Sequence, residues 1–346
     1  MSNARKIRIG ERTVGPGHPT YIVAEIGINH NGDANLAHRM VDAAADSGAD
    51  AVKFQTMDAD ASYAPGTPSH EVFSEAALDL EQYRGLEAHC DERGIDFFTT
   101  PGDWPSLEIC RGLSITAIKI SSGLMTNKPI VEAAARMGVP LVISTGGAYV
   151  WEIGKVVYEL ESMGKTDFVL LHCVSVYPAP DEILNLRAIE SMREAFPYPI
   201  GYSDHSTGRV APVSAVALGA CLIEKHFTTD RNLPGGDNHM SAEPDEFALM
   251  VQEIRDLEKM LIGDGKRPHE SEDGFRSRFR RRLVARVDIP AGEVLTRESV
   301  GLMRPLEPRG LAAEFFEDVL GRRTARDVRQ HEPIDWDALT LGAERD

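Results

Sequence analysis

Residues 201–206, with the sequence GYSDHS, place a serine, an aspartate and a histidine next to one another. These are the residue types of a hydrolytic triad, in which the histidine lies between the nucleophile and the acid. The residues that precede them predict a β-strand, whose successive side chains point to opposite faces. Ser203 and His205 then share one face while Asp204 points to the other, so the three residues cannot form a triad. The serine and the histidine must serve a different chemistry.

The elements that position these residues repeat an apolar, β-forming run followed by an amphipathic helical stretch. The predicted strands cover residues 21–28, 51–56, 96–101, 117–122, 140–146, 167–173, 199–206 and 221–228. Several helical stretches end at a glycine, which is typical of a helix C-terminus. Eight such units match a (β/α)8 TIM barrel, and no strand leads into the G-x-G-x-x-G turn of a doubly wound sheet. The sequence therefore predicts an α/β fold built on a barrel.

Polar side chains stand at the carboxyl ends of the predicted strands, where such barrels carry their reactive groups. They are Glu25, Asn29, Lys53, Gln55, Thr100, Lys119, Ser121, Ser122, Ser144, Thr145, His172, Ser175, Tyr177, Ser203, His205, Glu224 and His226. Alternation along a strand pairs Lys53 with Gln55, Ser203 with His205, and Glu224 with His226 on common faces. Lys225, between the last two, is expected to point outward to the helices.

Two lysines, several hydroxyls and two histidines suit a phosphate ester and a divalent cation. Each piece alone also has a structural interpretation. A lysine in VKFQT can extend along the strand to water, and a histidine in HFT can be a hydrogen-bonded core residue. The gathering of polar ends on one face favours the functional interpretation, because buried polar groups need partners. Residue spacing alone leaves the metal open.

Charge and composition narrow the classes of partner. Residues 266–346 contain 16 basic and 16 acidic side chains, so the net charge of −17 falls on residues 1–265. An acidic body disfavours nucleic acid, whose binding needs a basic surface. Neither a transmembrane run nor a signal peptide is predicted. Four scattered cysteines without a C-x-x-C pair indicate reduced thiols and a cytoplasmic location.

The last part of the chain has a different character. Residues 263–282 are polar and lack apolar periodicity, and their six arginines are interleaved with acids, which indicates a solvated linker. Short β-like pieces with turn signals follow. We predict a barrel domain over 1–265, a linker over 266–282 and a small β-rich domain over 283–346. About 65 residues form a small core for an independent domain.

Residues 20–250 contain a series of motifs, which in chain order are AEIGINHNG, GADAVKFQT, FFTTP, AIKISSG, VISTGG, LLHCVSVYPAP, NLRAI, GYSDHS, ALGACLIEKHFT and LPGGDNHMSAEPDEF. In this order they resemble the sialic acid synthase family, the phosphoenolpyruvate-dependent synthases of N-acetylneuraminate and related nonulosonic acids. The tail, which includes VARVDIPAGEVLTRESVGLMRP, resembles the family's antifreeze-like SAF domain, a small β-clip fold. The resemblance covers nearly the whole chain.

The resemblance implies a metal-assisted condensation of phosphoenolpyruvate with an aldose, giving a 2-keto-3-deoxy acid and phosphate. It assigns His205 and His226 to a divalent metal, Mn²⁺ first and Mg²⁺ or Co²⁺ as alternatives, and Glu25 to the reacting centre. The positions that match phosphoenolpyruvate contacts are Lys53, Thr100, Lys119, Ser122, Ser144 and Ser203. Those on the acceptor side are Gln55, Ser175, Tyr177, Asp237 and Arg304, with Arg309 as the fallback for the arginine.

The acceptor side departs from the pattern of the N-acetylneuraminate members. SSGLM has Leu124 where they carry an acid, and HCVS has Ser175 where they carry asparagine. The resemblance therefore predicts the reaction and leaves the acceptor open between N-acetylmannosamine and a related amino or diamino sugar.

The resemblance also implies a homodimer in which the tail crosses to the partner barrel and delivers an arginine to its site. Two other interpretations remain at this point. Lys119 is a candidate Schiff-base lysine of a TIM-barrel pyruvate aldolase, which borohydride trapping would reveal. A non-catalytic carbohydrate-binding scaffold is the second, because the tail resembles an ice-binding fold.

Overall fold

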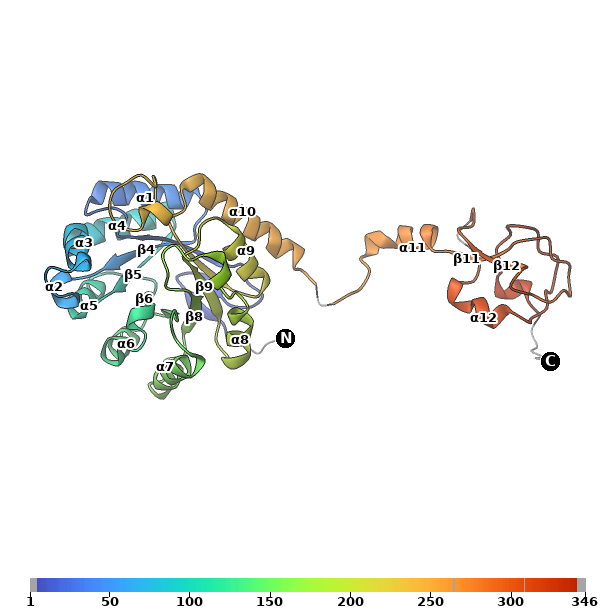
Figure 1. Ribbon diagram of the computed structural model, residues 1–346, viewed down its shortest axis with the longest axis horizontal. Helices are drawn as coiled ribbons and strands as arrows, with labels where there is room; N and C mark the ends of the chain where they lie inside the picture. Colours follow the sequence, from blue (N-terminus) through green and yellow to red (C-terminus); the bar gives the residue numbers. More distant parts are fainter. Residues whose placement is uncertain (1–4, 264, 308, 341–346) are drawn as a thin grey trace. The chain divides into compact units, whose positions relative to one another are not determined.

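The computed structural model describes residues 5–263, 265–307 and 309–340, which divide into two compact units between Ile262 and Gly263. In the first unit eight parallel strands close into a barrel in the order β10-β3-β4-β5-β6-β7-β8-β9 (Figure 1). Their bounds are β3 Tyr21–Gly27, β4 Ala51–Thr56, β5 Asp96–Pro101, β6 Ile118–Ile120, β7 Leu141–Ser144, β8 Phe168–Cys173, β9 Ile200–Asp204 and β10 Leu222–His226. The predicted barrel is confirmed, with each strand inside its predicted range.

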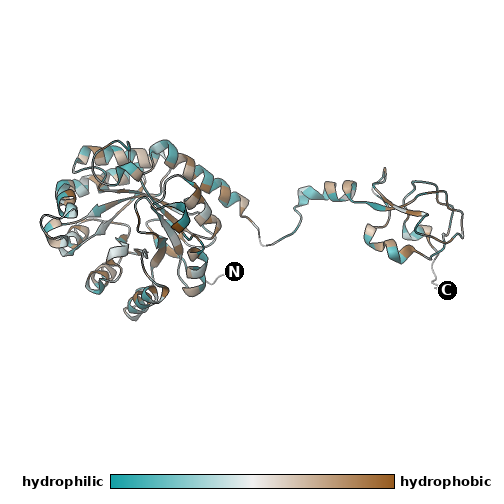
Figure 2. Ribbon diagram, in the orientation of Figure 1, coloured by the Kyte–Doolittle hydropathy of each residue, from teal (hydrophilic) through white to brown (hydrophobic). Residues whose placement is uncertain are grey.

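Helices cover the outside of the barrel. They are α1 Ala34–Asp46, α4 Leu80–Arg93, α5 Trp104–Arg111, α6 Lys128–Ala135, α7 Val150–Ser162, α8 Ala188–Ala195, α9 Val210–Ala217 and α10 Pro244–Met260. Most of them mix hydrophilic and hydrophobic residues (Figure 2), and the apolar residues pack on the strands. The sequence explains where helix α4 begins and ends. Asp79 and Gln82 form a capping box at its N-terminus, and Gly94, with a φ of 67°, caps its C-terminus. Two short helices, α2 Ala59–Ser62 and α3 Pro68–Ala76, lie between β4 and α4.

A hairpin that sequence reasoning missed precedes the barrel. Strands β1 Ile7–Ile9 and β2 Arg12–Val14 pair antiparallel and bury apolar residues in the barrel's core. Arg12 forms an ion pair with Asp50, with 3.0 Å between Nε and Oδ1. Asp50 directly precedes β4, so the hairpin lies at the end of the barrel where the strands begin. The opposite end is left for the site.

The second unit has its own core around the antiparallel pair β11 Arg282–Ala285 and β12 Val300–Met303. Short elements complete it: η5 Ala313–Phe315, α12 Phe316–Val319 and η6 Trp336–Ala338. The segment expected to be a linker without structure contains η4 Glu270–Glu272 and α11 Asp273–Phe279. Phe275 and Phe279 stack there with ring centroids 4.6 Å apart, as an i, i+4 pair does on a helix. None of the described helices is long and apolar enough to cross a membrane.

Candidate active site

The alternation predicted for GYSDHS is confirmed. Ser203 and His205 face the barrel interior, whereas Asp204 pairs with Lys225 of the neighbouring strand, with 2.6 Å between Oδ2 and Nζ. Nζ of Lys225 also donates to the carbonyl of Ser206 at 2.8 Å. Both charged side chains are buried on the outer side of the strands, so this ion pair joins β9 to β10 behind the site.

A buried network of two lysines and two glutamates occupies the centre of the site. Lys53 Nζ lies 2.7 Å from Glu25 Oε2 and 3.8 Å from Glu224 Oε2. Lys119 Nζ donates to Glu224 Oε1 at 2.9 Å, and so does Ser203 Oγ at the same distance. Glu224, which sequence reasoning found at a strand end without giving it a role, thus joins both lysines.

The network shifts the pKa values of its members. Burial disfavours the charge of Glu224, but Lys119 and Lys53 outweigh burial and lower its pKa to about 2. Burial raises the pKa of Glu25, because Lys53 offsets only part of the desolvation. Burial has the opposite effect on a cation and lowers the pKa of Lys119. Glu224 is therefore ionised. The pKa of Glu25 is shifted toward the range in which a carboxyl exchanges protons with a substrate.

Hydroxyl groups line the neighbouring strand ends. Ser122 Oγ accepts a hydrogen bond from the N–H of Gly146 at 2.9 Å, and Ser144 Oγ is buried without a partner. A Cβ on Gly146 would lie 2.2 Å from Ser175 Oγ and 2.8 Å from Ser122 Oγ, so a larger residue there would displace these two hydroxyls. Thr100 Oγ1 accepts from Lys53 Nζ at 3.1 Å. These groups form a set of donors suited to an oxyanion.

The two predicted histidines lie side by side, with ring centroids 5.4 Å apart. His205 Nδ1 is 2.7 Å from the carbonyl of Val174, which must accept, so Nε2 carries the free lone pair of the neutral ring. His226 Nδ1 is buried without a hydrogen bond, and burial with the charge of His205 holds its pKa well below the ordinary value. Burial alone would lower the pKa of His205, but its hydrogen bonding to Cys173 and to the carbonyl of Val174 outweighs burial and raises it. His172 instead contacts the carbonyl of Leu184 and lies outside this group.

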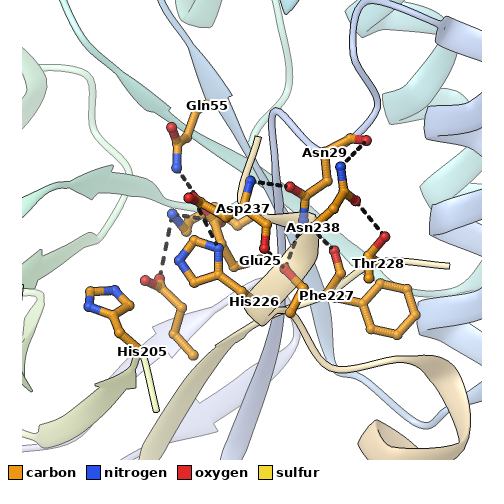
Figure 3. Close-up of polar contacts among 12 residues, drawn as sticks. Glu25, Asn29, Gln55, His205, His226, Phe227, Thr228, Asp237 and Asn238 are labelled. Atoms are coloured by element: carbon orange, nitrogen blue, oxygen red, sulfur yellow. Dashed lines mark hydrogen bonds and ion pairs between the residues drawn. The ribbon is translucent and has the colours of Figure 1, made fainter. Parts of the chain in front are cut away.

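The predicted acceptor-side residues surround the histidines. Tyr177 stacks on His205 with 4.1 Å between ring centroids, and its side chain is half-exposed. Gln55 Nε2 donates to Glu25 Oε1 at 2.8 Å (Figure 3). Asp237 Oδ2 lies 3.6 Å from His226 Nδ1. Tyr177 and Asp237 thus converge on the pair of imidazoles from two separate loops, while Gln55 reaches Glu25 from β4.

Comparison with known proteins agrees with this geometry. The model of the NeuB family matches residues 40–267 and that of the SAF domain matches residues 280–340. The chain belongs to the NeuB family. It is 37% identical to the N,N'-diacetyllegionaminic acid synthase of Campylobacter jejuni, over 91% of this chain and 98% of that protein. It is 41% identical to an uncharacterized protein of Methanocaldococcus jannaschii, over 96% of this chain and 98% of that one.

Among solved structures, the NeuB-family chain is similar to an N-acetylneuraminic acid synthetase from Leptospira borgpetersenii in complex with citrate. The TM-score is 0.75 and the identity 38%, over 79% of this chain and 95% of that one. Relatives with assigned activities are named synthases, and this chain is an enzyme of the same family.

The SAF domain carries the remaining predicted residues of this NeuB-family enzyme. The guanidinium of Arg304 lies 4.3 Å from the ring centroid of Phe279, and Arg309 pairs with Glu307 at 3.0 Å. Both arginines therefore belong to the second unit.

Sequence reasoning missed Ser241 and Asn238, which hold the loop that carries Asp237. The available signal was the pair Gly235–Gly236 directly before Asp237, with φ angles of 71° and 53°. Consecutive glycines in left-handed conformations indicate that a loop is folded closely against its surroundings.

Proposed function

We propose that this NeuB-family enzyme condenses phosphoenolpyruvate with an aldose to give a nonulosonic 2-keto-3-deoxy acid and phosphate. The supporting observation is the convergence of two buried lysines, an unpartnered serine hydroxyl and two imidazoles at one end of the barrel. An amino or diamino sugar is the proposed acceptor, because the legionaminic acid synthase is among the relatives and the acceptor side departs from the N-acetylneuraminate pattern.

Phosphoenolpyruvate would bind through Lys53, Lys119 and the hydroxyls. Lys119 and Ser203 share Glu224 Oε1, so Ser203 can turn its single O–H toward phosphate while Lys119 keeps that carboxylate partnered and offers phosphate a second N–H. Ser144 Oγ gains the partner that it lacks in the protein alone. Because the two glutamates balance the two lysines, the binding of a trianion to this site would be strengthened by a further positive charge.

The two histidines fit a divalent cation. His205 Nε2 is free to ligate, and His226 is held neutral, which is the form that binds metals. No larger cluster of metal-ligating side chains is found among residues that the structure describes, so water and substrate would complete the coordination. We propose Mn²⁺, with Mg²⁺ and Co²⁺ as alternatives. When bound, it would polarise the aldehyde oxygen as a Lewis acid.

The reaction needs one new carbon–carbon bond and two proton transfers. C3 of phosphoenolpyruvate attacks the aldehyde carbon, and the aldehyde oxygen becomes a hydroxyl by taking a proton. Water adds at C2 and loses the proton that the aldehyde oxygen takes. The tetrahedral intermediate then breaks its C2–O bond to phosphate, the C2 hydroxyl becomes the keto group, and the proton of that hydroxyl goes to the released phosphate. Glu25, with its raised pKa and its hydrogen bond from Gln55, is placed to carry one of these protons.

We expect phosphate release from phosphoenolpyruvate only when an aldose and a divalent metal are both present. The measurement supplies phosphoenolpyruvate, Mn²⁺ and a panel of N-acetylhexosamines and diacetamido hexoses, and assays phosphate and the 2-keto acid. Metal-free protein that turns over at the full rate with the same acceptor would contradict the role of the histidines. No release with any acceptor would contradict the function.

A Schiff-base aldolase is the second candidate, since burial lowers the pKa of Lys119. The hydrogen bond between Lys119 Nζ and Glu224 Oε1 disfavours it, because an ammonium held by a carboxylate is a poor nucleophile. Borohydride with pyruvate would label Lys119 in an aldolase and leave the synthase unlabelled.

We further propose a homodimer in which the SAF domain of each chain serves the barrel of its partner through Arg304. A mixture of Arg304→Ala and His205→Ala chains tests the exchange. Exchanged domains should restore about a quarter of the parent activity, because random pairing gives mixed dimers in half of the cases and each has one intact site. Domains that serve their own barrel would restore none, and the unmixed variants are the controls.

A further inference from the structure

The loop between β10 and α10 is tied to the loop after β3 by Asn29 (Figure 3). The N–H of Asp237 donates to Asn29 Oδ1 at 2.8 Å, and Ser241 Oγ donates to the carbonyl of Asp237 at 2.8 Å. Asn29 Nδ2 donates in turn to Ser241 Oγ at 2.9 Å and to the carbonyl of Phe227 at 2.9 Å. Asn29, Ser241 and the two backbone groups of Asp237 therefore form one connected set of hydrogen bonds, which we call the Asn29 clamp.

The chain is shaped to allow this contact. A Cβ on Gly236 would lie 2.7 Å from Asn29 Oδ1, so the loop approaches the asparagine only because residue 236 is glycine. Asn29 and Ser241 are both buried, so the hydrogen bonds are shielded from water. Because the buried side-chain amide of Asn29 makes three of these hydrogen bonds, it holds its partners in one arrangement. Loss of one of these bonds would leave a buried polar group without a partner and would destabilise the protein.

The clamp leaves the side chain of Asp237 as the one part of that residue directed to the site. Its backbone N–H and carbonyl are both held, and its carboxylate stands 3.6 Å from His226 Nδ1 at the mouth of the barrel. About a third of this side chain, 34%, is exposed, so it can meet a substrate that enters there. The backbone from which this carboxylate projects is consequently held by Asn29, which belongs to a loop more than 200 residues away in sequence.

We propose that Asn29 is a positioning residue that fixes the carboxylate of Asp237 beside His226 for the hydroxyls of the acceptor sugar. The proposal rests on the function proposed above, because it assigns the acceptor to this side of the histidines. Asn29 itself touches neither substrate, and its effect passes through Asp237.

Turnover kinetics test the role. Asn29→Ala should raise the acceptor KM about tenfold, the effect of one displaced hydrogen bond, and leave the KM for phosphoenolpyruvate unchanged. Ser241→Ala removes one member of the clamp with little change in volume and should act in the same direction, which keeps the test open if Asn29→Ala does not fold. An equal rise in both KM values would overturn the proposal.

A double-mutant cycle separates positioning from a general structural effect. In an Asp237→Ala background, Asn29→Ala should change the acceptor KM by less than about twofold, because the carboxylate through which it acts is already gone. A change as large as in the parent background would mean that Asn29 acts independently of Asp237, and would overturn the proposal.

Hydrogen exchange at the amide of Asp237 gives a readout that needs no turnover. Asn29→Ala should accelerate this exchange about tenfold. Thr99→Ala is the control, since Thr99 on β5 is an equally buried polar residue whose hydroxyl bonds to Thr56 Oγ1 and the carbonyl of Phe54 on β4, away from the clamp. Equal acceleration in both variants would overturn the clamp. If the parent released no phosphate with any acceptor, the proposed function would fail while exchange still decided whether Asn29 holds Asp237.

Discussion

Replacing His205 or His226 with alanine is expected to lower turnover by at least about a thousandfold, because lost Lewis-acid stabilisation of several kcal/mol corresponds to that factor. Each imidazole projects from the end of a strand in a closed barrel, so its loss should leave the fold intact. Turnover is measured with saturating phosphoenolpyruvate and acceptor, Mn²⁺ affinity by calorimetry, and the fold by circular dichroism and thermal melting.

His172→Gln is the control for this prediction. His172 is another buried imidazole on the neighbouring strand β8, but its Nε2 contacts the carbonyl of Leu184 rather than the site. This variant should keep the Mn²⁺ affinity of the parent and most of its turnover. If the two alanine variants bound Mn²⁺ as tightly as the parent, the assignment of the ligands would be wrong.

Replacing Glu224 with glutamine is expected to destabilise the protein by about 3–5 kcal/mol, the usual effect of removing one partner from a buried ion pair. Lys119 and Lys53 would keep their charges without the carboxylate that balances them. Inorganic phosphate should then stabilise the variant more than the parent, because the anion takes the place of the missing charge. Urea unfolding with and without phosphate measures both effects.

The pH dependence of stability provides a second test of Glu224. Its pKa is lowered in the folded protein, from 4.5 to about 2, so the stability that it contributes is present above the unfolded value and is lost as the pH falls through that window. The difference in unfolding free energy between the parent and Glu224→Gln should therefore shrink as the pH is lowered from 4.5 to about 2. A difference independent of pH would show that Glu224 is not held as a carboxylate by the lysines.

Strand periodicity predicted well which side chains point into the barrel, because the alternation of side chains along a strand depends only on local geometry. The sharing of one face by Ser203 and His205, and the outward direction of Lys225, follow from alternation along a strand whose ends are marked in the sequence. The barrel follows from the repeat of strand and helix. These predictions needed no knowledge of contacts between distant segments.

What sequence reasoning missed depends on such contacts. The hydrogen bonds from Asn29 to the Asp237 loop join residues more than 200 positions apart, and no periodicity relates them. Asn29 was noted as a strand-end residue, but its partners were unknown. The helix α11 was overlooked because its only apolar signal is the pair Phe275 and Phe279 among charged residues. Contacts between distant loops, and a helix with only one apolar pair, leave no repeating pattern in a single sequence by which they could be predicted.

The buried ion pair between Asp204 and Lys225 has a bearing on how the enzyme would select its cation. These residues are register partners on adjacent strands, and each directly precedes one of the two histidines. The spacing of the two strand ends that carry the imidazoles is therefore fixed by the sheet. If the histidines hold the proposed cation, an ion of unsuitable radius would have to stretch a bond buried in the wall of the barrel to draw the rings together. Size discrimination would then reside in the rigidity of the strands rather than in the identity of the ligands. Coordination would also proceed with little reorganisation of the protein.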